Sequence, residues 1–375
     1  MSGRSGIRVK GRLPVGIYRT AVNKEGIKME VYHIKSKKRE TYNVQVKYSI
    51  LFECALGIAA ITHKRLIDTL EKSQNEWEEI KKSLTEEMRE HLQFVEENNT
   101  WKALLQLLYE EDFHDVSQFH TTIDSLSEED LKYICLPFLG EKYEEKRRLA
   151  ASTDVTAIHE LKELTQDHPF FSTYISFICD VDVQVLKSHL IAVMTGWYES
   201  VIKSEEEEIL SILKRDYEAK NEMNKKMKPE EFVEWATGGV NYMPEPSVHH
   251  VLLIPQMTYR PWNIEADIDD TKVFHYPVAN ESIHPEDPYE PNYFLVQKHK
   301  ALGDEARLRI VKMLFEKERT LQEITERLQL GKSTVHHHLK LLRAAKLVDI
   351  HEGKYVLRKK AVQSLAKELD AFLNR

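Results

Sequence analysis

Cysteine is scarce in this chain of 375 residues, and the three that occur, Cys54, Cys135 and Cys179, form no C-x-x-C pair. So few isolated thiols exclude a small secreted fold held together by disulfides, and they suit a reducing compartment. We therefore expect a cytoplasmic protein in which the three thiols are small core residues.

Long apolar runs are also missing. The longest, Ile50 to Ile61, is interrupted by Glu53 and is shorter than the roughly 18 residues that a membrane helix needs. The basic first 29 residues have no apolar core of the kind found in signal peptides. The sequence therefore predicts neither a membrane partner nor export.

The motifs of common enzyme classes do not occur either. The chain has no G-x-x-x-x-G-K-[ST], no G-x-G-x-x-G, no H-E-x-x-H and no G-x-S-x-G. One Glu-x-x-His spacing in a helical stretch, Glu111 with His114, falls short of the carboxylate set of a di-iron bundle. We expect no enzymatic activity, no cofactor and no metal site.

What the chain does have is a strong division of charge. Its net charge is -8, but residues 292–375 carry +8, residues 48–291 carry -25 and residues 1–47 carry +9. Lysines and arginines that neutralise phosphates supply most of the non-specific affinity for nucleic acid. The basic C-terminal end is therefore the expected docking site for a polyanion, and the acidic middle is not.

Periodicity divides the chain into three parts. Residues 1–40 show no sustained pattern and are expected to be a flexible basic segment, or alternatively a nucleic-acid-binding arm. Residues 41–290 read mainly as amphipathic helices with a few strands, including runs near residues 42–48, 248–254 and 272–276. Four prolines between residues 277 and 291 predict a semi-rigid connector. The expected fold is mainly α, with a large helical N-terminal domain and a smaller domain in residues 291–375.

The most specific pattern lies in residues 320–346. Two apolar stripes at helical spacing stand on either side of Gly331, namely Leu321, Ile324 and Leu328, then Val335, Leu339 and Leu342. Such a pair predicts a helix-turn-helix, whose second helix lies in the major groove of DNA. Two strand-like runs follow, residues 347–350 and 354–358, joined by His351-Glu352-Gly353. A hairpin directly after a recognition helix predicts a wing.

Residues 300–310, KALGDEARLRI, and residues 332–340, KSTVHHHLK, resemble the winged-helix regulators of the arsenic-repressor (ArsR) family. The resemblance covers residues 292–375. More loosely, Leu253-Ile254-Pro255 and Arg260-Pro261-Trp262 resemble the long uncharacterised N-terminal domain that some members carry. The resemblance of residues 292–375 implies a winged helix-turn-helix DNA-binding domain.

Side chains of the second helix that face away from its apolar stripe can meet DNA: Lys332, Ser333, His336, His337 and Lys340. Position by position, the resemblance makes Lys332, Ser333, His336 and His337 base-facing, and Thr334 a phosphate contact or helix cap. His338 either packs against the first helix or is exposed. Further phosphate candidates are Arg343 and the hairpin residues Lys354 and Arg358.

The resemblance also bears on metal sensing. Metal-sensing members carry cysteines on the first helix of the motif or a His/Asp set on the last helix. Residues 320–330 hold no cysteine, and residues 361–373 hold Asp370 but no histidine, so metal sensing is not expected. The three adjacent histidines 336–338 diverge around a helix and cannot chelate one ion.

In the family, helices that flank the motif form a dimer, which points to residues 292–302 and 361–373. In the latter an apolar stripe either forms that contact or closes the domain's own core: Val362, Leu365, Leu369 and Phe372. We therefore predict a homodimeric transcriptional regulator, a repressor, that binds double-stranded DNA and whose N-terminal domain senses an unidentified small-molecule effector. The alternative is an enzyme or protein-docking domain that a winged helix tethers to DNA.

Overall fold

The computed structural model describes residues 18–23, 26–31, 41–63, 67–287 and 289–374, which belong to two compact units, residues 1–41 and 42–375. The first unit contains an antiparallel hairpin of β1 (Tyr18–Asn23) and β2 (Gly26–Val31). The sequence predicted no regular structure here, and for these twelve residues that prediction is wrong. The overlooked signal lies in β2, where Ile27, Met29 and Val31 alternate with Lys28 and Glu30. The rest of the flexible segment expected in residues 1–40 lies outside the described residues.

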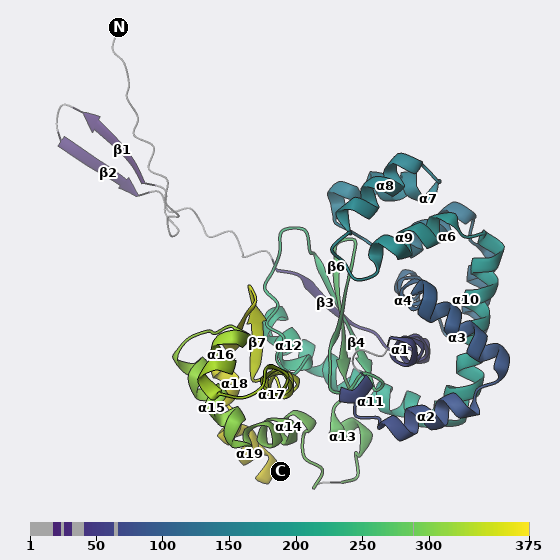
Figure 1. Ribbon diagram of the computed structural model, residues 1–375. Coiled ribbons are helices and arrows are strands. Elements are labelled where there is room, and N and C mark those ends of the chain that lie inside the picture. The colour runs from purple at the N-terminus through teal and green to yellow at the C-terminus, as the bar shows by residue number, and fades with distance from the viewer. Residues whose placement is uncertain (1–17, 24–25, 32–40, 64–66, 288, 375) are drawn as a thin grey trace. The chain divides into compact units, whose positions relative to one another are not determined.

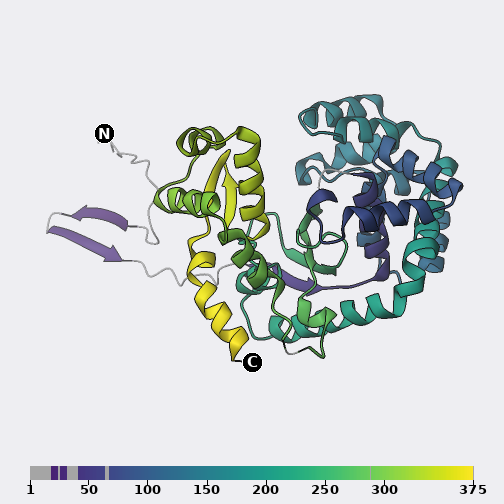
Figure 2. The ribbon, with the colours of Figure 1, turned by 60° about the horizontal axis from the view of Figure 1, so that its bottom comes forward.

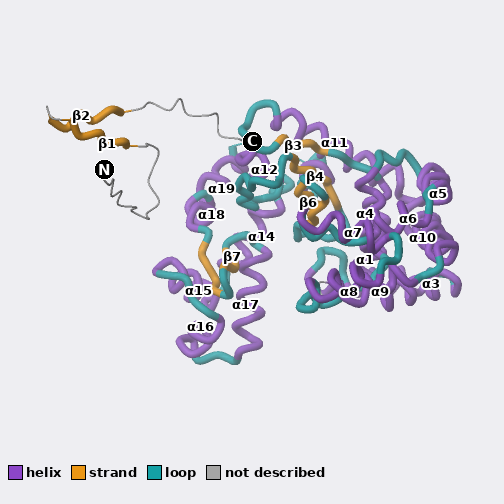
Figure 3. Tube along the Cα trace, turned by 90° about the horizontal axis from the view of Figure 1, so that it is seen from above, coloured by secondary structure: helices purple, strands orange, loops and turns teal. Residues whose placement is uncertain are grey.

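The N-terminal part of the second unit contains a four-stranded sheet, with most of its helices on one side (Figures 1 and 3). Its strands are β3 (Asn43–Val46), β4 (His250–Gln256), β5 (Ile264–Ile268) and β6 (Thr271–Pro277), in the order β3-β4-β6-β5. β3, β4 and β6 are parallel and β5 is antiparallel. The runs expected near residues 42–48, 248–254 and 272–276 are thus β3, β4 and β6, whereas β5 was not predicted.

Helices make up most of this part of the chain, as expected. They are α1 (Ile50–Thr62), α2 (Gln74–Ser83), α3 (Glu86–Asn98), α4 (Trp101–Glu110), α5 (Val116–Ser125), α6 (Glu128–Cys135), α7 (Glu144–Ala151), α8 (Val155–Leu164), α9 (Phe171–Asp180), α10 (Val183–Trp197), α11 (Glu206–Asn224) and α12 (Pro229–Ala236). Four short helical turns join them: η1 (Ile67–Thr69), η2 (Glu141–Tyr143), η3 (Tyr198–Ile202) and η4 (Lys203–Glu205). Many of these helices start at a residue whose side chain accepts a hydrogen bond from a first-turn amide. Ser73, for example, forms a capping box with Glu76 at the start of α2.

Helix α1 is buried on every side, because almost all of its residues are apolar. It packs against α3, α4, α10 and α11. Gly57 lets the Trp197 ring approach so closely that a Cβ would lie 2.7 Å from the indole. The one charged residue, Glu53, accepts hydrogen bonds from the backbone amides of Met257 and Thr258, at 2.7 and 3.1 Å. This carboxylate joins the central helix to the end of β4.

The two faces of the sheet pack against different cores. Alternate residues of β4 point to opposite sides, as the strand period requires. Leu252 and Ile254 join the large helical core around α1. Val251 and Leu253 join a second cluster that includes Phe232 of α12. The central strand is therefore covered on both faces, which explains its continuous apolar sequence.

The C-terminal part of the second unit contains α14 (Tyr293–Leu302), α15 (Glu305–Glu316), α16 (Leu321–Leu328), α17 (Lys332–Ala344), β7 (Val348–His351), β8 (Lys354–Leu357), α18 (Lys359–Gln363) and α19 (Leu365–Leu373). In Figure 2 the green to yellow helices of this module gather around the short hairpin of β7 and β8. Its buried cluster draws only on residues 301–357. The module thus has a core of its own, and the boundary near residue 290 stays a prediction.

Between the sheet and α14 lies the segment predicted to be a connector, which includes the short helix α13 (Asn280–Ile283). It is held by buried polar groups. Asp216 of α11 accepts hydrogen bonds from the Ala279 amide at 2.9 Å and from the Ser282 hydroxyl at 3.1 Å. Arg215 donates to the Ser282 carbonyl at 2.9 Å. These contacts fix the first half of the proline-rich segment on α11.

Candidate nucleic-acid interface

The turn between α16 and α17 is set by local hydrogen bonds. Helix α16 starts with a capping box, in which Thr320 Oγ1 accepts from the Glu323 amide at 3.3 Å and Glu323 Oε2 accepts from the Thr320 amide at 2.7 Å. It ends at Gln329, which adopts the left-handed conformation with φ 56°. Gly331 then stands extended before α17, so the break expected at Gly331 is made two residues earlier, by Gln329.

Helix α17 is oriented by its apolar stripe. Val335, Leu339 and Leu342 are fully buried. They share one core with the α16 residues Ile324 and Leu328. Because the stripe faces inward, the opposite side of the helix is left to solvent. The stripes predicted from the sequence are confirmed as the packing faces of both helices.

The open side of α17 carries the predicted DNA-binding residues. Six of them are exposed, namely Lys332, Ser333, Thr334, His336, His337 and Arg343. The seventh, Lys340, is partly exposed. Within the described part of the chain, none of these seven side chains makes a hydrogen bond or an ion pair with another residue. The structure therefore gathers them on one helix with their polar groups available to an external partner.

The start of α17 is open as well. Its N-cap is Gly331, which supplies no side chain to accept from the first backbone amides, and the first turn holds no acidic residue. Uncapped amides at a helix N-terminus, with the positive end of the helix dipole, favour a phosphate. Thr334, expected as a phosphate contact or a cap, lies inside this first turn and is exposed.

His338, whose position the sequence left open, is mostly buried. Its side chain is 14% exposed, and its Nδ1 lies 3.8 Å from Asp304 Oδ1. Asp304 caps α15 by accepting from the Arg307 amide at 2.9 Å, and this hydrogen bond is the main cause that lowers the pKa of its carboxyl. His338 therefore packs at the start of α15 and does not share the open side of α17.

The hairpin after α17 is tightly defined. β7 and β8 pair antiparallel, and the two-residue loop Glu352-Gly353 has φ of 49° and 75°. Positive φ at both positions is the requirement of a two-residue hairpin turn, which glycine meets easily. Arg319, which precedes the N-cap of α16, adds two backbone hydrogen bonds with Tyr355, at 3.1 and 2.8 Å, and so ties the hairpin to the start of α16.

The two hairpin residues predicted to contact phosphate are engaged within the protein. Lys354 Nζ lies 2.6 Å from Glu318 Oε1, and this hydrogen bond raises the pKa of the lysine. Arg358 is 13% exposed and pairs with Asp349 at 3.4 Å. The guanidinium of Arg358 also lies against Gly239, where a Cβ would be 2.7 Å from it. Lys354 stays half-exposed, but Arg358 does not join the open side of α17.

Two exposed cations that follow the hairpin were missed in the sequence. Lys359 and Lys360 start α18, directly after β8. Lys359 lies over the ring of Phe315, 4.7 Å from its centre, whereas the Lys360 side chain makes no hydrogen bond or ion pair with another described residue. The run of three basic residues 358–360 was the signal that could have found them.

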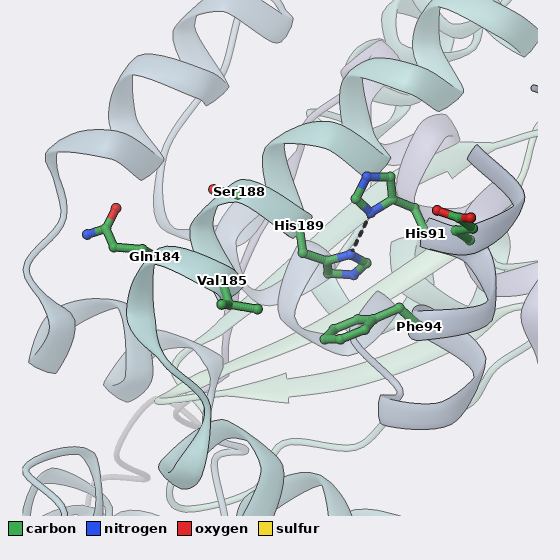
Figure 4. A pocket seen from close by; sticks show the side chains of 7 residues that line it. His91, Phe94, Gln184, Val185, Ser188 and His189 are labelled. Carbon is green, nitrogen blue, oxygen red and sulfur yellow. Dashed lines mark hydrogen bonds between the residues drawn. The ribbon is translucent and has the colours of Figure 1, made fainter. Parts of the chain in front are cut away.

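The helical part of the chain has a shallow groove of about 550 Å³ between α3 and α10. Its lining residues are Glu90, His91, Phe94, Gln184, Val185, Ser188 and His189. Figure 4 shows the His91 and His189 rings facing one another, with their Nδ1 atoms 3.1 Å apart. His189 Nε2 also lies 2.9 Å from the hydroxyl of the buried Thr100. Burial, and then the neighbouring His91, lowers the pKa of His189 to about 3, so its ring is neutral at ordinary pH.

Other candidate chemistry is limited. Cys54, Cys135 and Cys179 are free and buried, as predicted, and burial raises the pKa of the Cys179 thiol to about 11. Among the described residues, no three or more His, Cys, Asp or Glu side chains are grouped to hold a metal ion. Within those same residues, no helix is long and apolar enough to cross a membrane.

Comparison with known protein families places part of the C-terminal module in a described family. Residues 304–349 match the family model described as bacterial regulatory protein, arsR family. This range runs from the cap of α15 through α16 and α17 into β7. No curated protein and no solved structure matches the chain significantly.

Proposed function

Because residues 304–349 form an ArsR-type helix-turn-helix, which indicates DNA-binding transcription regulation, we propose that this protein is a sequence-specific repressor that acts in the cytoplasm on double-stranded DNA. The observation that carries the proposal is the unpartnered set of polar and cationic side chains on α17, opposite its buried stripe. A helix placed in this way can enter the major groove while its other face stays in the core.

We assign separate roles to the residues of this surface. Ser333, His336, His337, Lys332 and Lys340 face the bases, and the amides of the first turn, with Thr334, hold a phosphate. Arg343 and Lys360 contact the DNA backbone on either side of α17. The β7–β8 hairpin is the wing, with Lys354 as its phosphate contact once DNA competes with Glu318. Arg358 instead holds the base of the wing, because its guanidinium is already paired and buried.

We further propose a homodimer. Helices α14 and α19 pack together through Lys298 and Glu368, whose charged atoms are 2.7 and 2.8 Å apart. On α19, Leu369 is 37% exposed and Leu373 is 70% exposed, although both are apolar. Exposed leucines at this spacing support a contact with a second copy, which would place two α17 helices on a two-fold symmetric site.

The third element of the proposal is effector sensing by the N-terminal part. The groove beside His91 and His189 offers apolar walls with a few polar groups, the usual character of a small-molecule site. The net charge of -25 over residues 48–291 disfavours anions, so we expect a neutral or cationic effector. A ligand can shift DNA affinity only by its preference for one arrangement of the protein over another, typically about 1–3 kcal/mol.

Two measurements test the proposal. Genome-wide mapping of sites bound by the full-length protein identifies target DNA, and titration of that DNA by anisotropy measures affinity. Affinity should fall at least tenfold between about 50 and about 200 mM salt, because displaced counterions drive binding. A Lys332→Ala, Lys340→Ala double variant should bind weakly, whereas Lys162→Ala in α8 should not change binding. If the wild type binds no duplex at low salt, DNA binding is refuted.

The regulatory sign is tested separately, in cells. If the protein represses, transcription of genes beside the mapped sites rises when the chain is deleted. It should fall again when the wild type is restored, but not when the Lys332→Ala, Lys340→Ala variant is restored. A loss of transcription on deletion would make the protein an activator and would leave the DNA-binding proposal intact.

A further inference from the structure

The open side of α17 offers an unbalanced set of hydrogen-bonding groups. Residues 332–344 contain no Asp, Glu, Asn or Gln. Lysine and arginine side chains only donate, whereas hydroxyls and neutral imidazoles can both donate and accept. No side chain on this face is therefore acceptor-only, and none has the paired donor and acceptor of a carboxamide.

Three of these side chains form a row. Successive residues on a helix differ by about 100°, so the buried stripe of α17 defines the centre of the opposite face. Ser333, His337 and Lys340 lie closest to that centre, at spacings of four and three residues, and therefore stand one above the other along the helix. All three belong to the set that makes no hydrogen bond or ion pair with another described residue.

The major groove presents a different pattern for each base. Guanine shows two acceptors, N7 and O6, which suit lysine or arginine. Adenine shows an acceptor beside a donor and is matched by Asn or Gln, while cytosine shows a donor and is matched by Asp or Glu. Helix α17 has neither of the last two kinds of side chain. Lys340 facing an adenine or cytosine amine would set donor against donor, with both groups removed from water.

We propose that the row of Ser333, His337 and Lys340 reads guanine, so that each half-site is marked by guanines whose N7 and O6 face α17. This rests on the proposed DNA-binding function and makes it specific. Lys340 supplies the contact that only donates, and His337 donates from one ring nitrogen. Ser333, nearest the start of the helix, donates its hydroxyl proton to the next acceptor in the groove.

The first test uses the full-length protein and a pool of random duplexes. Duplexes retained after selection should be enriched in guanine at fixed positions of each half-site. In the selected duplex, replacing those guanines by 7-deazaguanine removes N7 and keeps base pairing. Affinity should fall roughly three- to tenfold for each contacted guanine, whereas 7-deazaadenine elsewhere in the site should have little effect.

The two hypotheses fail differently in this test. If 7-deazaguanine leaves affinity unchanged and 7-deazaadenine lowers it, the guanine inference is wrong and DNA binding stands. If no duplex is retained at low salt, the proposed function fails and the inference fails with it.

A second test changes a residue of α17 and keeps the DNA unchanged. Lys340→Gln introduces a carboxamide into the row and should move the preference at the corresponding base pair from guanine towards adenine, by roughly tenfold relative to the wild type. His159→Asn, at an exposed histidine of α8, is the control and should keep the wild-type preference. An unchanged guanine preference in Lys340→Gln, with DNA affinity retained, would remove Lys340 from the reading row.

Discussion

Arg260 and Asn280 are joined by a buried hydrogen bond of 2.6 Å, from the guanidinium Nη2 to Asn280 Oδ1. The same amide group donates from Nδ2 to the Glu290 carboxylate at 2.7 Å and to the Pro291 carbonyl at 2.8 Å. Pro291 immediately precedes Asn292, which caps α14. One carboxamide thus links the loop after β4 to the start of the helix-turn-helix module.

The first prediction concerns this link. Asn280→Ala removes one of the acceptors of the buried Arg260 guanidinium, which keeps Glu71 and the Val278 carbonyl, and it removes the donor to the Pro291 carbonyl. A buried polar atom that loses its hydrogen bond is costly. We expect the free energy of unfolding in urea to fall by about 1–3 kcal/mol. Asn98→Ala, which loses a single hydrogen bond to the Phe94 carbonyl within α3, is the matched control and should cost less. Equal losses would mean that the Asn280 amide adds nothing beyond a local hydrogen bond.

The second prediction separates base contacts from phosphate contacts. Ser333→Ala or His337→Ala should weaken binding to the preferred site by about 1–3 kcal/mol and relax preference at particular base pairs. Lys354→Ala should instead weaken binding to all sequences alike and reduce the salt slope by about 1. Anisotropy titrations on preferred and scrambled duplexes distinguish the two patterns. Uniform weakening by His337→Ala would place that residue on phosphate.

The third prediction concerns assembly. A charge at the exposed leucines of α19, as in Leu369→Asp with Leu373→Asp, should be unfavourable inside an apolar contact between two copies and should give a monomer at micromolar concentration. Sedimentation velocity measures the mass directly. Val155→Asp, at an apolar side chain of α8 that is 79% exposed, should leave the dimer intact. A wild-type monomer, with and without DNA, would contradict the dimer.

The fourth prediction is a pH dependence of stability. Burial lowers the pKa of His275 to about 3, as it does for His189, while histidines in the unfolded chain titrate near 6.5. Below pH 6.5 the unfolded chain takes up protons that the folded protein refuses, so the stabilisation present above pH 6.5 is lost on acidification. Each histidine should contribute a loss of about 2 kcal/mol between pH 6.5 and pH 5.

The measurement compares urea unfolding of wild type and His189→Gln across this pH range. The difference isolates His189 from other titrating groups, such as Glu53, whose pKa burial raises and which therefore acts in the opposite direction. His159→Gln, at a side chain 72% exposed, is the control and should keep the wild-type slope. If His189→Gln shows the same slope as the wild type, His189 is not held neutral.

The fifth prediction tests the packing of the central helix. Gly57→Ala places a methyl group 2.7 Å from the Trp197 ring, whose residue is only 1% exposed. Overpacking of this kind costs about 1–3 kcal/mol of stability. Gly303→Ala, where the nearest atom is 3.4 Å away, is the control and should be close to neutral. An unchanged unfolding midpoint for Gly57→Ala would show that the indole can shift at no cost.

The parts of the fold that were predicted from the sequence are those that depend on the local periodicity of apolar residues. The stripe of Val335, Leu339 and Leu342 fixes both the course of α17 and its inward face, because all three lie within eight residues. The strand β5 was missed although its five residues alternate between apolar and polar, because so short a run is weak evidence for a strand until it pairs with β6. Five residues of the open side of α17 followed from the stripe by geometry, namely Lys332, Ser333, His336, His337 and Lys340, whereas Thr334 came from the family resemblance.

Contacts between distant residues were beyond the sequence. Lys354 was predicted to be free for phosphate, but Glu318 reaches it from 36 positions earlier. His91 and His189 are 98 positions apart in the sequence and lie on different helices, so no spacing rule predicts that their rings are in contact. Arg358 was likewise a reasonable phosphate candidate until its position against Gly239 was known. Periodicity predicts which way a side chain points. Tertiary packing decides whether that side chain already has a partner within the protein.

The order of the strands has a consequence for how the protein is made. β3 pairs with β4, so Asn43 lies opposite His250, and the central helix α1 follows β3 directly along the chain. During synthesis at about 5–20 residues per second, β3 and the apolar α1 therefore wait on the order of ten seconds or more for their partners to be translated. Such distant pairing makes folding slow and leaves apolar surface exposed in the meantime. We expect nascent chains that end before β4 to depend on chaperones, while the helix-turn-helix, whose contacts are short in sequence, folds rapidly once it is complete.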